Sequence, residues 1–306
     1  MEPHVDRDRL FGDLNEGILA ERRTAFERNL GHNLPLIRRY GGLKRIIPEL
    51  SGKGAVVIGA GPSLEKNLGL LKRCQLRREL VYIAVDMALG PLASAGIRPR
   101  FVISCEASPV DFFQGIDTAG IHLLAFSCAS CVNLRKWRGD MSFYNWMIHR
   151  PEYAALWDTA GRDLGFLGTG SLVTTQAAAF ALGCGVGSLV LVGNDLGFED
   201  RFYARGTVAH RNMNRTTCRI APPETLEMQR SMRAREYRIL RGTREFYTTR
   251  QFLAGKLWLE DLFRNVRVPV YDCSDPGCSE KYVAKMELID FMGAIDSRMV
   301  KKRRNT

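Results

Sequence analysis

The segment 55–64, Ala-Val-Val-Ile-Gly-Ala-Gly-Pro-Ser-Leu, constrains the fold of this chain more than any other. Its β-branched beginning predicts a buried strand, its glycines allow a tight turn, and Pro62 suits the first position of a helix. Gly59 and Gly61 would let a phosphate approach the main chain, with the helix N-terminus and the Ser63 hydroxyl as donors. The alternative is a strand-to-helix turn without a ligand, and two glycines do not separate these hypotheses.

The length and charge of the chain limit its class and its partners. With 306 residues, 45% of them hydrophobic, the chain has room for one large α/β domain with helical additions. The net charge of +11 favours anionic partners, and substrate phosphate alone could explain much of it. The charged N-terminus lacks the apolar segment of a secretory signal, so a cytoplasmic location is expected. Glycines interrupt the one long uncharged stretch, 172–192, which predicts a buried helix, a turn and a strand.

Carboxylates follow three of the predicted strands. Each comes at or just after the end of an apolar run: Asp86, Glu106 and Asp195. Open α/β sheets place ligand contacts at the carboxyl ends of their strands, so these side chains are candidates for one site. A helix N-cap or a surface position is the alternative for the first two.

A second loop of small residues precedes a predicted buried helix. It has the sequence Gly168-Thr169-Gly170-Ser171 and leads into an apolar run. Such a loop is again suited to binding an anion, and two of them in one sheet could hold two parts of a nucleotide-linked ligand. Gly170 and Ser171 are therefore candidates for nucleotide binding, as is Asn194, which precedes Asp195.

The pattern changes after residue 198. An aromatic and polar loop carries Tyr203 and His210, and the segment 224–241 predicts a helix that is dense in arginine. Such a helix is usually a solvated face, but it could form a lid over phosphates or bind an acidic partner. A basic stretch at 301–304 ends the chain.

These elements predict three parts. We expect a helical lead-in at 1–50, and a nucleotide-binding domain at 51–285 with a helical insertion at about 211–265. A C-terminal helix and a basic tail follow at 286–306.

Four motifs in order, GAGPSL, GIRPRFVIS, GTGSLVTT and GNDLGF, make the chain resemble the Maf and MptE-like family. This family joins motility-associated flagellin glycosyltransferases to archaeal 6-hydroxymethylpterin diphosphokinases, and the GPSL turn is also similar to that of sialyltransferases that use CMP-sialic acid. The resemblance implies a Rossmann-like, mostly parallel sheet flanked by helices. It also implies nucleotide binding, with transfer of a nonulosonic acid or of diphosphate.

The resemblance assigns expected positions to the candidate residues. It puts Gly59, Gly61, Pro62 and Ser63 at the nucleotide, Asp86 and Glu106 at the sheet edge, and Gly170, Ser171 and Asp195 around the reacting groups. Relatives often have aspartate where this chain has Glu106. The chain also lacks the large flanking regions of the flagellin enzymes, on which recognition of the acceptor would depend.

Three functional hypotheses follow. The first is a glycosyltransferase that uses a nucleotide-linked donor such as a CMP-nonulosonic acid. In it Asp195, Glu106 or His210 acts as general base on an acceptor, for example a protein such as flagellin. The second is a diphosphokinase in which Asp86, Glu106 or Asp195 holds Mg²⁺ bridging ATP phosphates. The third is a module that binds a nucleotide without turnover; nucleic acid is not an expected partner.

Overall fold

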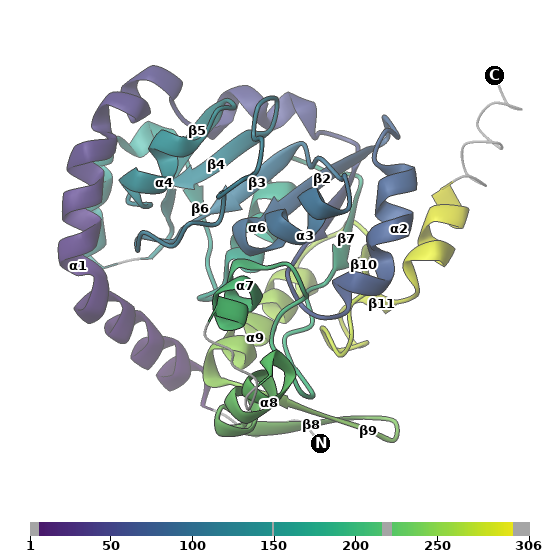
Figure 1. Ribbon diagram of the computed structural model, residues 1–306. Helices are drawn as coiled ribbons and strands as arrows, with labels where there is room; N and C mark the ends of the chain where they lie inside the picture. Colours follow the sequence, from purple (N-terminus) through teal and green to yellow (C-terminus); the bar gives the residue numbers. More distant parts are fainter. Residues whose placement is uncertain (1–5, 149, 216–221, 296–306) are drawn as a thin grey trace, which may run out of the picture.

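Nine parallel strands form the centre of the computed structural model, which describes residues 6–148, 150–215 and 222–295. Their order across the sheet is β11-β10-β7-β1-β2-β3-β4-β5-β6 (Figure 1). The strands are β1 (Gly54–Ile58), β2 (Leu80–Val85), β3 (Phe101–Ser104), β4 (His122–Phe126), β5 (Met141–Trp146), β6 (Phe166–Leu167), β7 (Ser188–Val192), β10 (Val270–Asp272) and β11 (Ala284–Lys285). The expected α/β fold with a parallel sheet flanked by helices is confirmed.

The strand order changes direction beside the first strand. β1 pairs with β2 on one side and with β7 on the other, both in parallel register. Strands β1 and β2 are buried over almost their whole length, as expected for a parallel sheet covered on both faces. A crevice therefore opens at the carboxyl ends of β1 and β7, where such folds bind ligands.

Helices cover both faces of the sheet (Figure 1). They are α1 (Arg7–Tyr40), α2 (Leu64–Cys74), α3 (Leu89–Ser94), α4 (Cys131–Lys136), α5 (Pro151–Ala160), α6 (Val173–Gly183), α7 (Val208–Arg215), α8 (Pro223–Arg233) and α9 (Arg250–Arg264). Short 3₁₀ helices occupy Leu43–Glu49, Asp86–Ala88 and Arg162–Leu164, and a further helical stretch covers 288–295. Across the described part of the chain, no helix combines the length and apolar character that a bilayer crossing needs.

Within the expected lead-in, the structure has one long helix, α1, which runs along the outer side of the sheet in Figure 1. Asn29 and Asn33 on its inner side are buried. The Nδ2 of each donates to two main-chain carbonyls just beyond β3 and β4, at distances of 2.9 to 3.2 Å. Since these bonds replace water on buried amides, they fix α1 over the carboxyl edge of the sheet.

The helix expected at 224–241 is only partly correct. It ends at Arg233, and the chain then forms an antiparallel hairpin of β8 (Tyr237–Arg241) and β9 (Arg244–Thr248). Ile239 and Phe246 face each other across the hairpin and are buried, which is the alternation of a strand. Gly242 supplies the positive φ of the turn. The basic stretch at 301–304 lies outside the described residues.

Candidate functional site

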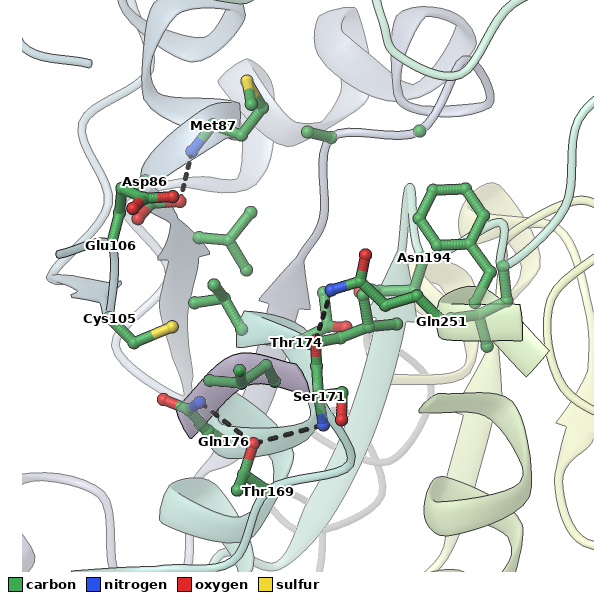
Figure 2. Close-up of a pocket in the computed structure, with 18 of the residues that line it drawn as sticks. Asp86, Met87, Cys105, Glu106, Thr169, Ser171, Thr174, Gln176, Asn194 and Gln251 are labelled. Carbon is green, nitrogen blue, oxygen red and sulfur yellow. Dashed lines mark hydrogen bonds between the residues drawn. The ribbon is translucent and has the colours of Figure 1, made fainter. Parts of the chain in front are cut away.

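A pocket of about 420 Å³ opens at the carboxyl edge of the sheet. Its walls come from the ends of β1, β2, β3, β5 and β7, from the loop before α6, and from α1 and α9. Figure 2 shows many of these side chains around the cavity. Six of the predicted site residues line it: Gly61, Asp86, Glu106, Ser171, Asn194 and Asp195.

Asp195 is a buried carboxylate between the two central strands, with only 4% of its surface exposed. Its Oδ2 accepts the Ser63 main-chain N–H at 2.9 Å, and its Oδ1 accepts the Ser63 hydroxyl. Burial raises the pKa of Asp195 to about 7, although the two bonds from Ser63 favour the charged form. A carboxylate of this pKa can accept a proton near neutral pH.

The GAGPSL turn packs against this carboxylate and not against an open space. A Cβ on Gly61 would lie 2.5 Å from the Asp195 Cγ, and a Cβ on Gly59 would lie 2.4 Å from the Gly193 carbonyl oxygen. The Gly61 N–H donates to the Gly193 carbonyl. The glycines therefore permit close contact with the segment after β7. The Ser63 N–H is bonded to Asp195 in this structure, so a phosphate would reach it only by displacing that carboxylate, and the phosphate-binding role expected for the turn stays a prediction.

Asp86 and Glu106 lie close together at the ends of β2 and β3, as Figure 2 shows. Asp86 is buried and accepts the Ser104 hydroxyl at 2.7 Å and the Met87 N–H at 2.8 Å. Burial, with a smaller effect from the Glu106 charge, raises the pKa of Asp86 to about 6. Glu106 pairs with Arg22 of α1 at 2.6 Å, so the long helix supplies a cation to the strand ends.

The second small-residue loop is shaped mainly by packing. Cβ atoms on Gly168 and Gly170 would lie 2.7 and 2.5 Å from the side chain of Trp258 on α9. The Gly170 N–H donates to the Thr175 hydroxyl at 2.8 Å. Gly170 thus allows α9 to approach the loop, and does not line the pocket. Ser171 does line it, with a positive φ of 68° that non-glycine residues seldom adopt.

Four other predicted residues lie elsewhere. Gly59 is buried in the contact between β1 and β7, while Pro62 and Ser63 line a second pocket on the other side of Asp195. His210 on α7 is not among the residues that line the pocket. Its Nδ1 faces the Gly206 N–H at 3.5 Å, so the structure does not place it beside Asp195.

The carboxylates do not form a ready metal site. Within the residues that the structure describes, no group of three or more His, Cys, Asp or Glu side chains could hold a metal ion. Asp86 is bonded to Ser104 and Met87, and Glu106 to Arg22. The three carboxylates hypothesised as magnesium ligands are therefore each bonded to protein donors in this structure, and their role toward an ion stays a prediction.

The arginine-dense segment is divided between α8 and the hairpin. Burial raises the pKa of Tyr203 in the pocket wall, and Arg230 on α8 lies close enough to lower it in part. Arg238 on β8 pairs with Glu245, Nε to Oε1, at 2.9 Å. A lid over the ligand would therefore depend on α8 and not on the hairpin, and it stays a prediction.

Much of the pocket wall was not predicted from the sequence. Its aromatic side chains are Phe26, Phe112, Trp146, Phe202, Tyr203 and Phe252. Phe202 and Tyr203 belong to the aromatic loop after β7, where the sequence gives a local signal. The others come from α1, α9, the end of β5 and the loop between β3 and β4, and their own segments read as ordinary core. Aromatic rings at a ligand pocket suit stacking on a flat or partly apolar group.

Comparison with known proteins agrees with this architecture. Residues 28–201 match the family described as "6-hydroxymethylpterin diphosphokinase MptE-like". A solved structure, the Maf glycosyltransferase from Magnetospirillum magneticum AMB-1, has the same fold, with a TM-score of 0.54 and 18% sequence identity. The match covers 78% of this chain and 34% of that chain, so this protein spans about a third of its length. No curated protein matches the sequence. Because the matched segment takes up more than half of the chain and contains β1 to β7, this chain belongs to the MptE-like family.

Proposed function

We propose that this protein is a glycosyltransferase that moves a sugar from a CMP-nonulosonic acid to an acceptor hydroxyl. The observation that supports it is Asp195, a buried carboxylate whose pKa is raised to about 7, at the edge of a pocket of about 420 Å³. Transfer to a hydroxyl needs a base, and a base is most effective when its pKa lies near the working pH. The fold shared with a Maf glycosyltransferase is consistent with this reaction.

Asp195 is the general base in this mechanism. The acceptor oxygen forms a bond to the anomeric carbon of the donor while Asp195 takes the hydroxyl proton. The bond from that carbon to the nucleotide phosphate breaks, and CMP leaves with the electron pair. Arg22, which pairs with Glu106 in this structure, is the one cation among the described residues of the pocket wall, and the proposed mechanism assigns it to meet the charge on the leaving phosphate.

The Asp195→Asn variant tests this assignment. Asparagine can still accept the Ser63 N–H, so the variant should fold, but it cannot take up the proton. We expect the release of CMP from CMP-N-acetylneuraminic acid to fall by about a hundredfold or more. Binding of CMP by calorimetry should change by less than about threefold. Unchanged turnover in the folded variant would remove Asp195 from the reaction.

A diphosphokinase is the second candidate, because the family description names that activity. The two activities differ in the nucleotide they need. A thermal-shift panel of CMP, CTP, ATP and GTP, each with and without magnesium, separates them. Stabilisation by cytidine nucleotides alone supports sugar transfer, and magnesium-dependent stabilisation by ATP supports the kinase. Binding with no turnover of either donor would support a non-catalytic module.

A further inference from the structure

The long helix α1 forms one wall of the pocket of about 420 Å³. The residues of α1 that line this pocket are three or four positions apart, on one face of the helix: Asn15, Ile18, Arg22 and Phe26. From residue 26 onward, α1 is held by its two buried asparagines and by apolar side chains that belong to the main core. The wall of the pocket therefore continues beyond the anchored half of the helix.

The first turns of α1, residues 7–18, are attached differently, and we call them the flap. Within this range only Leu10 is buried. It packs on Leu253, Ala254 and Leu257 of α9, in a small apolar cluster separate from the main core. Figure 1 shows the flap, in dark purple, reaching towards α9. The flap thus spans from the anchored half of α1 to α9, and Asn15 and Ile18 on it close one side of the pocket.

The other contacts of the flap are exposed ion pairs. Each of the six side chains is at least 34% exposed in the pairs Arg7–Asp261, Asp13–Arg250 and Glu16–Arg150. Exposed pairs of this kind contribute little, because water and salt screen them. The contact between the flap and α9 therefore depends mainly on one small apolar cluster.

Two glycines weaken the flap further. A Cβ on Gly12 or on Gly17 would meet nothing within 4 Å, so close packing does not require glycine at either position. Glycine destabilises the interior of a helix, because it gains more freedom than other residues when the helix unwinds. A helical segment with few buried contacts and two such glycines should open more readily than the rest of α1.

We propose that the flap is a gate for the first pocket: it unwinds and leaves α9 to admit a ligand, and it re-forms over the ligand once bound. Release of the flap moves Asn15 and Ile18 out of the wall. It also uncovers the first turn of α9, where Gln251 and Phe252 line the same pocket. Such a gate serves any ligand of this pocket, whichever reaction takes place there.

Hydrogen exchange on the full chain tests the opening. Amides of 11–18 should have protection factors at least about tenfold lower than those of 27–34 in the same helix. The double variant Gly12→Ala/Gly17→Ala should raise the protection of the flap at least about fivefold, because alanine favours the helix. The matched control is Gly31→Ala, in the anchored half, where a Cβ also meets nothing within 4 Å. It should leave the protection of the flap within about twofold.

The free thiol of Cys105, in the pocket wall, reports whether this opening admits a small molecule. Its modification by N-ethylmaleimide, followed by peptide mass spectrometry, should slow at least about threefold in the double variant. Leu10→Ala removes most of the apolar contact with α9 and should speed it at least about fivefold. Cys131 does not line the pocket and should react at the same rate in all these proteins.

Two results would overturn the proposal. Equal protection of 11–18 and 27–34 in the wild type would mean that the flap opens no more often than the anchored half. Greater protection of the flap in the double variant, with no change at Cys105, would mean that the flap does not control access to the pocket. Neither measurement uses a nucleotide, so both can be read even if sugar transfer is not the function of this protein.

Discussion

The contact between Ser63 and Asp195 influences the ionisation of the Asp195 carboxyl. Burial alone would hold this carboxyl protonated, since moving a charge from water into the protein interior is costly. Ser63 offsets part of that cost with a main-chain N–H at the start of α2 and a hydroxyl. The balance leaves the pKa of Asp195 at about 7, within the range of a useful base. In this structure both Ser63 donors are directed to Asp195, and the phosphate-binding role expected for Ser63 from the sequence stays a prediction.

Ser63→Ala tests this balance. The variant keeps the main-chain bond but loses the hydroxyl, so the pKa of Asp195 should rise and the pH dependence of turnover should shift to higher pH. At pH 6.5, CMP release should fall by about five- to tenfold, whereas at pH 9 it should change by less than about twofold. Ser63→Thr keeps a hydroxyl and serves as the control. An equal loss at every pH would mean that Ser63 contacts the substrate instead.

At the scale of elements, glycines bring α9 and the loop before α6 together. Gly170→Ala places a Cβ 2.5 Å from the Cβ of Trp258, a contact that neither residue can avoid by changing rotamer. We expect urea unfolding to report a loss of about 1–3 kcal/mol.

Gly69→Ala is the matched control for Gly170→Ala. Gly69→Ala, in the interior of α2, adds a Cβ that meets nothing within 4 Å. It should leave stability unchanged or raise it by up to about 1 kcal/mol. A Gly170→Ala variant that is as stable as wild type but no longer binds CMP would support the anion-binding role expected for this loop.

The same elements show what the sequence could and could not predict. The strands around β1, β2 and β7 were predictable because apolar runs that end in small or acidic residues are typical of buried parallel strands. The hairpin at 237–248 was missed because arginine is as common in helices as in strands. Its buried pair, Ile239 and Phe246, gives each short strand one apolar position, which is too little for an alternating pattern. The pocket walls from α1 and α9 depend on tertiary contacts, which no local pattern carries. The roles of the candidate site residues stay predictions.

At the scale of the whole molecule, buried ionisable groups connect stability to pH. Burial raises the pKa of Asp86 to about 6 and that of Asp195 to about 7, so both bind protons more tightly in the folded state. Their stabilising effect is complete at low pH and is lost as pH rises from about 4 through these values. His122 acts in the opposite direction. Burial lowers its pKa to about 4, so its effect is lost as pH falls from about 6.5.

Comparing Asp195→Asn with wild type isolates one of these groups, because Asp86 and His122 are the same in both proteins. Wild type should lose the stabilisation from Asp195 between pH 5 and pH 8, whereas the variant has no carboxyl to ionise there. The free energy of unfolding of the variant relative to wild type should therefore rise by about 2 kcal/mol across this range, by urea unfolding. Asp140→Asn, which removes an exposed carboxyl, should show little change and gives the baseline. A difference between variant and wild type that stays constant with pH would show that Asp195 is ionised throughout, and it would not then titrate as a base near neutral pH.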